Sequence, residues 1–375
     1  MNNVKFIIKY IVYSFFVIFP IKKNKIVCNN FMGKGFGDNP KYIVNELINQ
    51  KTNCDIVWVC KPEYARSLPS SVRIATKWYE ILYEFATAKI WISNVRLPRY
   101  LRKRKGQFYI QTWHGGLGFK KVEKDVVDSL SRGYVKDAIH DARQTDLMIA
   151  NCKFLENLYK DSFWYDGYVL CEGLPKNDCL TKSTPEKDNE ILSKYNLHGF
   201  DIILYAPTFR KKMDKEVYNI NFNSLIKLLN KKTNKKWKVI VRLHPNVNFP
   251  ENYIDFNNDI INVSDYDDIN DLYSISDMLI SDYSSIMFDF MLTNKPVFIY
   301  ATDIEEYKKD RDFYLSIEEL PFSISTNNKE LLKNVEKNDL KKLMYKYNKF
   351  NKKYGIINTG DSSKKIVKII EEKLG

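Results

Sequence analysis

Short apolar runs rich in β-branched residues alternate with longer segments of helical periodicity along almost the whole chain of 375 residues. Lys25–Asn29 and Phe108–Thr112 are two such runs in the first half, and Ile202–Tyr205 and Met278–Ile280 are two in the second half. This alternation is typical of α/β proteins with parallel sheets, because each parallel crossover requires a connection of helix length. We therefore expect an α/β fold of doubly wound sheets.

A polar stretch divides these elements into two halves. Residues Thr181–Asn189 contain no apolar run and leave about six predicted strands on either side. We predict a short N-terminal segment over residues 1–22, a first domain over 23–182 and a second domain over 183–375. The two doubly wound domains are expected to face each other across a cleft, with ligands beyond the carboxyl ends of the strands.

The charge balance indicates an anionic partner. Lys and Arg number 59 and Asp and Glu 46, which gives a net charge of +13. Nucleic acid, an anionic membrane and a phosphorylated substrate all fit this excess. No zinc finger, RNA-recognition motif or helix-turn-helix accompanies the basic clusters, so nucleic acid is not expected as a partner. The run Lys231–Lys238 and the Lys-rich C-terminal region are interpreted as solvated faces.

Residues 1–25 have features of a membrane-surface segment. They contain no acidic residue, and residues 10–19 carry no charge; the lysines are Lys5, Lys9, Lys22, Lys23 and Lys25. Ten residues are too few to span a bilayer as a helix, and no small-residue cleavage site follows them. An aromatic apolar segment between lysines suits the surface of an anionic membrane. A first core helix with a basic end is the alternative.

Polar or glycine-rich segments follow four of the predicted strands. Three strands of the second half lead into segments with basic, hydroxyl or acidic side chains, namely Thr208 and Arg210, then Arg242 and His244, then Asp282, Ser284 and Ser285. The strand Phe108–Thr112 leads into Trp113, His114, Gly115 and Gly116. Such residues at the ends of apolar strands are hard to explain as core.

The segment Ser281–Ser285 predicts an anion site. It offers hydroxyl groups and the free backbone N–H groups of a helix start, a combination that suits phosphate. Plain N-capping by Asp282 or Ser284 is the alternative. The hydroxyl and basic residues expected at the same edge of the sheet favour the phosphate site.

Two of the four histidines have a setting suited to chemistry. His114 precedes Gly115 and Gly116, where the backbone can approach a ligand closely, and His244 lies two residues after Arg242. An imidazole with a pKa near ~6.5 can act as a general base or, when charged, stabilise a phosphate.

Several standard chemistries have no motif here. The chain has no phosphate-binding P-loop, no strand-linked Gly-x-Gly-x-x-Gly and no Gly-x-Ser-x-Gly elbow. We find no Asp-x-Asp metal motif of the kind that metal-dependent sugar transferases carry. The six cysteines lack zinc-site spacing and are interpreted as reduced thiols of a cytosolic protein. We expect no cofactor and no resident metal, and the motifs leave open whether a divalent metal accompanies a substrate.

Five motifs in fixed order resemble the CDP-glycerol glycerophosphotransferase family of teichoic-acid and capsular polymer synthesis. They are Gln111-Thr-Trp-His-Gly115, Tyr205-Ala-Pro-Thr-Phe-Arg210, Arg242-Leu-His-Pro245, Ile280-Ser-Asp-Tyr-Ser-Ser-Ile-Met-Phe-Asp289 and Asn294-Lys-Pro296. The resemblance covers roughly residues 26–370. It implies a GT-B-like fold of two Rossmann-like domains, bound peripherally to the cytoplasmic face of the membrane.

The resemblance also implies a reaction and roles for residues. A polyol phosphate would pass from a CDP-polyol to a hydroxyl of an undecaprenyl-type lipid-linked acceptor, and CMP would be released. His114 matches the proposed general base. The residues that match the donor pyrophosphate site are Thr208, Arg210, Arg242, His244, Ser284 and Ser285.

Three alternatives stay open at this point. The first is CDP-ribitol in place of CDP-glycerol, since motifs that bind the diphosphate do not read the polyol. The second is a nucleotide-sugar glycosyltransferase of the same architecture, and the third a non-catalytic scaffold.

The chain also departs from the family pattern. Lys176 stands where many relatives have Arg, and Lys cannot make the bidentate contact of Arg. The C-terminal Thr359–Ser363 differs from the usual Asp-Gly-x-x-Ser.

Overall fold

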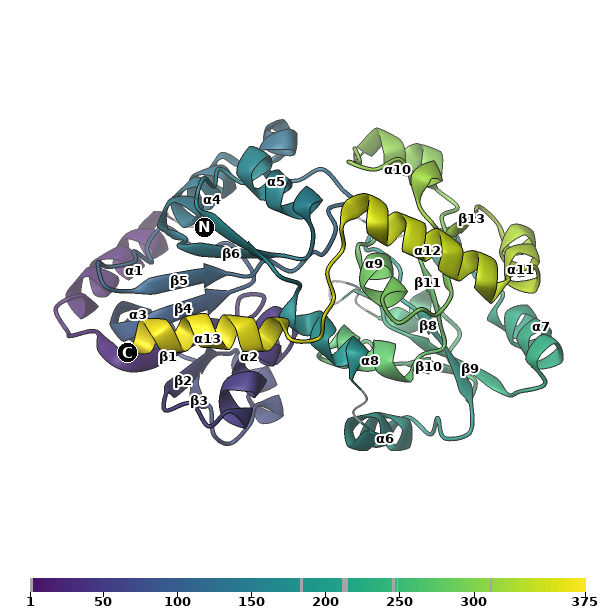
Figure 1. The fold of residues 1–375 in the computed structure, drawn as a ribbon, viewed down its shortest axis with the longest axis horizontal. Helices are drawn as coiled ribbons and strands as arrows, with labels where there is room; N and C mark the ends of the chain where they lie inside the picture. The colour runs from purple at the N-terminus through teal and green to yellow at the C-terminus, as the bar shows by residue number, and fades with distance from the viewer. Residues whose placement is uncertain (1–2, 183–184, 211–214, 245–246, 248, 311) are drawn as a thin grey trace. The chain divides into compact units, whose positions relative to one another are not determined.

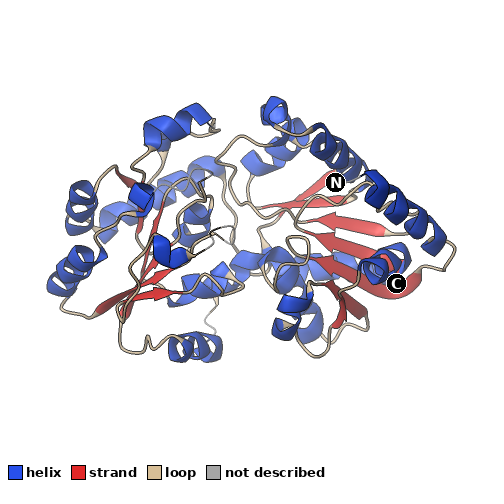
Figure 2. Ribbon diagram, turned by 180° about the vertical axis from the view of Figure 1, so that it is seen from behind, coloured by secondary structure: helices blue, strands red, loops and turns tan. Residues whose placement is uncertain are grey.

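The computed structural model describes residues 3–182, 185–210, 215–244, 247, 249–310 and 312–375. They form two compact units, each built on one fully parallel sheet with helices on both faces (Figures 1 and 2). Unit 1 comprises residues 1–114, 122–178 and 356–375, and unit 2 comprises 115–121 and 179–355.

Unit 1 contains a seven-stranded sheet in the order β3-β2-β1-β4-β5-β6-β7. Its strands are β1 (Lys22–Asn29), β2 (Asp55–Val59), β3 (Arg73–Ala75), β4 (Ala88–Ser93), β5 (Phe108–Gln111), β6 (Leu147–Ala150) and β7 (Tyr168–Cys171). Its helices are α1 (Asn3–Phe16), α2 (Asp38–Asn49), α3 (Trp78–Thr87), α4 (Arg132–Gln144), α5 (Lys153–Ser162) and α13 (Ser362–Leu374), with 3₁₀ turns η1 (Pro62–Ser67) and η2 (Glu123–Ser129).

Alternating residues of β1 separate the core of unit 1 into two layers. Ile26 and Cys28 face a cluster that includes Ile43 and Val44 of α2, whereas Val27 faces the opposite cluster. That second cluster contains apolar side chains of α1 and α3, such as Tyr13 and Phe85. The alternation follows from the two-residue period of a strand, and burial on both faces explains why these strands are continuous apolar runs.

Helix α13 completes the core of unit 1 although it follows all of unit 2 in the chain. It lies beside α2 (Figure 1), and Ile366, Val367 and Ile370 pack into the cluster of Ile26 and Ile43. The expected domain over 183–375 therefore does not hold as one piece, because residues 356–375 pack with unit 1. An amphipathic pattern shows that a helix buries one face, but it does not show against which sheet.

Lys176 belongs to the segment Gly173–Asp178, and this segment meets Thr359–Ser363 at the start of α13. The carboxylate of Asp178 accepts hydrogen bonds from the backbone N–H groups of Ser362 (3.0 Å) and Ser363 (2.7 Å). Gly173 has a φ of 100°, and a Cβ there would lie 2.4 Å from Ser362 Oγ. Glycine is therefore required by both conformation and space.

Unit 2 contains a six-stranded sheet in the order β10-β9-β8-β11-β12-β13. Its strands are β8 (Asp201–Tyr205), β9 (Trp237–Val241), β10 (Ile260–Asn262), β11 (Met278–Ser281), β12 (Val297–Tyr300) and β13 (Ser323–Ser325). Its helices are α6 (Pro185–Lys194), α7 (Phe222–Thr233), α8 (Ile269–Ile275), α9 (Ile286–Met291), α10 (Ile304–Asp310), α11 (Asn328–Glu336) and α12 (Leu340–Tyr354). Four 3₁₀ turns occur here or at the boundary, η3 (Pro175–Thr181), η4 (Lys215–Tyr218), η5 (Pro250–Asn252) and η6 (Ile317–Glu319).

One apolar cluster of unit 2 joins the sheet to α7 and α11. Ile203 and Val239 of the sheet pack with Leu225 of α7 and Leu331 of α11. Helices α8 and α9 contact the strands β8, β11 and β12. Each unit is thus a three-layer α/β structure, as the alternation of runs in the sequence predicted.

Helix α1 packs on unit 1 through one face and exposes apolar side chains on another. Tyr13 is fully buried, whereas the large apolar residues exposed in and just after α1 are Val4, Ile7, Ile8, Tyr10, Ile11, Phe15, Ile18 and Phe19. Arg102 contributes to the docking by donating to Tyr10 Oη (2.9 Å) and Ser14 Oγ (2.5 Å). Among the described residues, no helix has the length and apolar character needed to cross a bilayer.

One of the five N-terminal lysines cannot contact a membrane surface, because it is buried. Lys25 is fully buried and forms an ion pair with Glu84, with a distance of 2.5 Å from Nζ to Oε2. The expectation that five lysines flank the segment is corrected to four, because Lys25 belongs to the core-facing part of β1.

Candidate active site

The strand order of unit 2 reverses between β8 and β11, and ligands of doubly wound sheets bind at such a switch point. The segments that follow these two strands are held together by hydrogen bonds. The backbone N–H of Ala206 donates to the carbonyl of Ile280 (3.0 Å), and Ser281 Oγ donates to the carbonyl of Ala206 (2.7 Å). The segment after β9 lies next to them, since Arg242 N donates to the carbonyl of Tyr205 (2.9 Å).

Arg210 forms a buried ion-pair cluster at this edge. Its Nε donates to Asp303 Oδ2 (2.7 Å) and its Nη2 donates to Asp282 Oδ2 (2.9 Å). Nη1 donates to the carbonyl of Thr208 (2.8 Å), and the guanidinium lies 4.9 Å from the ring centre of Tyr283. Most of its hydrogen-bonding capacity therefore goes to protein groups, so the geometry supports ordering of the loop more directly than contact with a phosphate.

The charges of this cluster stabilise each other. Burial alone would raise the pKa of Asp303, but hydrogen bonds and charge from Arg210 lower that pKa below its usual value. Burial and the neighbouring Asp303 raise the pKa of Tyr283, whose hydroxyl donates to Asp303 Oδ1 (2.9 Å). Arg210 thus lies between the carboxyl groups of Asp282 and Asp303, and the Tyr283 hydroxyl contacts Asp303.

Asp282 orders the segments around the site. Its Oδ1 accepts hydrogen bonds from the backbone N–H groups of Thr208 (2.8 Å) and Tyr283 (2.6 Å). The carboxylate does not cap α9, which begins at Ile286 with Ser285 as N-cap and no side-chain cap bond. The capping alternative considered for Asp282 is therefore wrong.

Three hydroxyl groups at the edge are available to a ligand. Thr208 Oγ1 is buried and has no hydrogen-bond partner among the described residues. Ser284 and Ser285 are half-buried, and the contact from Ile286 N to Ser284 Oγ is long, at 3.5 Å. A buried hydroxyl without a partner costs free energy unless a ligand or water satisfies it. Helix α9 has only six residues, so the hydroxyls contribute more to an anion site than its dipole does.

Arg242 and His244 add basic groups from the segment after β9. Arg242 is half-buried, and its Nη2 donates to the carbonyls of Tyr266 and Asp267, both at 3.1 Å. His244 is exposed, and its ring centre lies 5.5 Å from that of Phe209. Unit 2 therefore brings seven predicted residues to one edge, namely Thr208, Arg210, Arg242, His244, Asp282, Ser284 and Ser285.

His114 follows β5 in unit 1, and its protonation state is defined by one hydrogen bond. Its Nδ1 lies 2.8 Å from the carbonyl oxygen of Asn94, which can only accept, so Nδ1 carries the proton and Nε2 has the free lone pair. Burial lowers the pKa of His114 to about 4. The ring is therefore neutral at pH 7, as a general base requires. Gly115 and Gly116 belong to the segment 115–121 of unit 2.

Aromatic and amide groups fix the position of the His114 ring. Trp113 stacks on it with ring centres 4.5 Å apart, and Phe31 lies at 5.2 Å. Asn94 is itself held, since its Oδ1 accepts from Phe31 N (2.9 Å) and its Nδ2 donates to Asn30 Oδ1 (2.7 Å).

Lys176 contacts the backbone next to the imidazole. Its ammonium donates to the carbonyl of His114 (3.0 Å), and the residue is only 4% exposed. Its Nζ also lies 4.0 Å from Asp38 Oδ2. Neither contact needs the fork of an arginine.

The segment Asp303–Tyr307 also resembles the family in sequence, but no supporting role was predicted for Asp303, Asn94 or Phe31. Asp303 follows β12, so the strand-end rule would have placed it at the edge of the site. Asn94 follows β4 in the same way. Among the described residues, no group of three or more His, Cys, Asp or Glu side chains could hold a metal ion.

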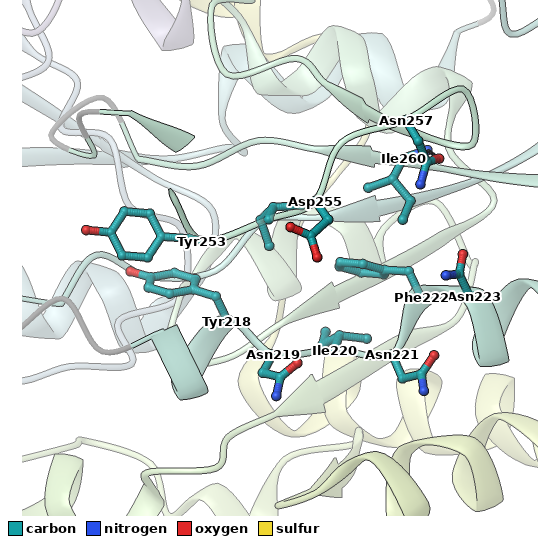
Figure 3. A pocket seen from close by; sticks show the side chains of 11 residues that line it. Tyr218, Asn219, Ile220, Asn221, Phe222, Asn223, Tyr253, Asp255, Asn257 and Ile260 are labelled. Atoms are coloured by element: carbon teal, nitrogen blue, oxygen red, sulfur yellow. Dashed lines mark hydrogen bonds between the residues drawn. The ribbon is translucent and has the colours of Figure 1, made fainter. Parts of the chain in front are cut away.

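A cavity of about 160 Å³ lies elsewhere in unit 2 (Figure 3). The rings of Tyr218 and Tyr253 stand next to each other, with centres 5.6 Å apart. Asn219, Asn221 and other polar side chains form the rest of its wall. None of the predicted site residues lines this cavity, so it is not the candidate active site.

The protein is a GT-B-like α/β protein with two Rossmann-like parallel sheets. Hydroxyl and basic side chains follow the strands of one sheet, and the neutral imidazole of His114 follows a strand of the other. The chain belongs to the family of CDP-glycerol:poly(glycerophosphate) glycerophosphotransferases, whose profile matches residues 11–372.

Relatives and a solved structure agree with this assignment. The chain is 30% identical over 370 residues to a teichoic acid poly(glycerol phosphate) polymerase of Staphylococcus epidermidis, covering 94% of this chain but only 51% of that protein. It is 30% identical over 352 residues to a teichoic acid glycerol-phosphate transferase of Staphylococcus aureus, covering 88% of both chains. The structure of the wall teichoic acid polymerase TagF matches with a TM-score of 0.85 at 28% identity, over 100% of this chain and 96% of that chain.

Relatives named for ribitol also match the chain. A teichoic acid poly(ribitol-phosphate) polymerase of Bacillus spizizenii is 28% identical over 319 residues, covering 80% of this chain and 49% of that protein.

Proposed function

We propose that this protein transfers glycerol phosphate from CDP-glycerol to a hydroxyl of a lipid-linked teichoic acid or capsule acceptor and releases CMP. The observation that carries the proposal is the neutral His114 imidazole, whose lone pair is on Nε2. It is supported by the hydroxyl and basic side chains at the strand ends of unit 2. The names of the relatives support glycerol phosphate as the transferred group.

In the proposed reaction, the acceptor hydroxyl attacks the phosphorus that carries glycerol. His114 Nε2 takes the hydroxyl proton while the new P–O bond forms. The bond from that phosphorus to the bridging oxygen of CMP breaks, and CMP leaves with the electron pair and an additional negative charge. A proton on the imidazole then returns to solvent, which restores the neutral ring.

The unit 2 edge is proposed to bind the donor diphosphate. Thr208, Ser284 and Ser285 donate hydrogen bonds to phosphate oxygens, and Arg242 and His244 stabilise the charge that grows as CMP leaves. Arg210, with Asp282 and Asp303, is assigned to holding the Thr208 segment in place. We propose no cofactor beyond the donor.

Helix α1 supports peripheral attachment to the cytoplasmic face of the membrane, where a lipid-linked acceptor would lie. Ile7, Ile11 and Phe15 are 55%, 60% and 58% exposed, which is unusual for large apolar side chains on one short helix. Arg99 and Arg102 pack beside the helix, at 5.2 Å from the ring of Phe6 and 4.1 Å from that of Tyr10. An apolar face with adjacent cations suits an anionic lipid surface.

The test is incubation of the full-length protein with CDP-glycerol, CDP-ribitol or a uridine diphosphate sugar, each with a lipid-linked glycerol-phosphate acceptor. We expect CMP release and acceptor elongation with CDP-glycerol. CMP release with CDP-ribitol but not with CDP-glycerol would show that the donor is CDP-ribitol. Release of a nucleoside diphosphate from the sugar donor would identify a glycosyltransferase. A His114→Asn variant serves as the control for enzyme-dependent release.

A further inference from the structure

Helix α12 (Leu340–Tyr354) carries six lysines and no acidic residue in 15 positions. Its buried face consists of Leu343, Tyr347 and Phe350, which pack near Phe288 and Phe322, with ring centres 5.7–5.8 Å apart. At 100° per residue, a stripe of four lysines lies about 100° around the helix from the centre of this buried face, and two more lie on the opposite side. The stripe consists of Lys342, Lys346, Lys349 and Lys353, and the other two are Lys341 and Lys352. All six are exposed, namely Lys341, Lys342, Lys346, Lys349, Lys352 and Lys353.

Five of these six lysines have no ion-pair partner in the part of the chain that the structure describes. Lys353 alone pairs, with Glu319 at 3.6 Å. Some exposed lysines on other helices do have partners. Lys153 and Lys160 both pair with Glu156 of α5, at 2.9 and 2.7 Å. The sequence pattern of α12 thus departs from the usual mixed charge of a solvated helix face.

The lysines also stand close to one another along the helix. Lys342, Lys346, Lys349 and Lys353 follow at intervals of three or four residues, which places one ammonium group about every ~5 Å along the axis. Like charges at this spacing destabilise a helix. A ligand that carries a regular series of negative charges would remove this repulsion and gain a contact with each lysine.

The surface differs from that of α1, which exposes a row of large apolar residues. Beside its lysines, α12 exposes only Leu340 (57%) and Tyr345 (70%) as large apolar or aromatic side chains. Binding to this face is therefore electrostatic and needs little insertion into an apolar phase. A soluble polyanion fits it better than a membrane interface does.

We propose that the lysine face of α12 binds the polyol-phosphate chain that the enzyme extends. This inference rests on the proposed function and adds that the transfer repeats, because repeated transfer makes a polymer with one phosphodiester charge in each repeat. The lysines contact phosphates without reading the polyol, so the chain can slide along them from one addition to the next. The face holds the growing chain between transfers and thereby increases the length of the product.

The first test measures polymer binding without any donor. A triple variant, Lys342→Gln, Lys346→Gln and Lys349→Gln, removes the centre of the face while glutamine keeps a good helix propensity. A matched triple variant, Lys227→Gln, Lys231→Gln and Lys236→Gln, removes the same charge from exposed lysines at and after α7 that also lack ion pairs within the described residues. The probe is a fluorescently labelled, purified 1,3-poly(glycerol phosphate) chain, titrated at several salt concentrations.

We expect the α12 variant to bind the polymer at least ~10-fold more weakly at low salt. Its plot of log affinity against log salt should be shallower by about 2, as expected for three lost phosphate contacts on a single strand. The α7 variant should behave like the wild type. Equal binding by the two variants would refute the proposal. The proposal would also be refuted if the α12 variant lost binding to single-stranded RNA or anionic vesicles but bound the polymer as the wild type does. In that case the lysines would bind another ligand.

The second test separates this inference from the proposed reaction. With CDP-glycerol and an acceptor that carries a single glycerol phosphate, the first transfer should be as fast in the α12 variant as in the wild type. The final product should be shorter in the α12 variant only. If no transfer occurs with any protein, the proposed reaction fails, while the donor-free binding measurement still decides whether α12 holds a polyanion.

Discussion

Replacing His114 with asparagine tests the assignment of the general base through two independent measurements. Asn can keep a hydrogen bond to the Asn94 carbonyl through its amide N–H, but it has no basic nitrogen in place of Nε2. Removal of a general base costs ~10²–10⁴ in rate. CDP-glycerol affinity should stay close to that of the wild type, because the donor residues lie in unit 2.

The same substitution changes how stability depends on pH. The pKa of His114 is about 4 in the folded protein and near ~6.5 in an unfolded chain. Between these values the unfolded state binds a proton that the folded state does not, so stability is full above pH ~6.5 and falls as the pH drops towards 4. The whole difference corresponds to about 3 kcal/mol, of which about 2 kcal/mol is lost between pH 7.5 and 5.0.

Urea unfolding at pH 7.5 and 5.0 measures this quantity. The wild type should lose about 2 kcal/mol more than His114→Asn between the two pH values. His198→Asn, which changes an exposed histidine, should behave like the wild type. An identical pH dependence in His114→Asn and the wild type would refute the lowered pKa. Unchanged transfer activity in His114→Asn would refute its role as the base.

Three further predictions concern the other residues discussed. His244→Ala should reduce transfer by ~10²–10³ and, unlike His114→Asn, should weaken CMP binding in calorimetric titration; unchanged binding would contradict its place in the donor site. Arg210→Met leaves two buried carboxylates without their cation and should cost ~3–5 kcal/mol in urea unfolding, whereas a loss below ~1 kcal/mol would mean that the cluster adds little to stability. The triple variant Ile7→Gln, Ile11→Gln, Phe15→Gln should move the protein from anionic vesicles to the supernatant in sedimentation without lowering its stability, and continued sedimentation would disprove the role of α1.

The strands of both sheets could be predicted well because they are buried on both faces. The predicted runs Ile202–Tyr205 and Met278–Ile280 agree with β8 and β11 to within one residue. The three-residue strands β3 and β13 were missed, since they stand at the edges of their sheets and contain Arg73 and two serines. Their pairing depends on a neighbouring strand and not on an apolar run.

The candidate site was predictable to the extent that strand ends define it. Parallel strands place their carboxyl ends at one edge, which brought Thr208, Arg242 and Asp282 together. What Arg210 does was not predictable, because its partner Asp303 lies 93 residues further along the chain. The sequence around a basic residue at a strand end does not show whether its side chain contacts a phosphate or a buried carboxylate.

The position of α13 has a consequence for how the protein folds during synthesis. A ribosome releases β1 to β7 first, but the cluster around Ile26 and Ile43 stays without Ile366, Val367 and Ile370 until all of unit 2 has been made. Multidomain chains generally fold from the N-terminus as each domain emerges. Here residues 179–355 emerge as an almost complete unit 2 while one apolar layer of unit 1 is still uncovered. The nascent unit 1 therefore presents aggregation-prone surface for the time needed to translate residues 179–355, and its core closes only after they have been made.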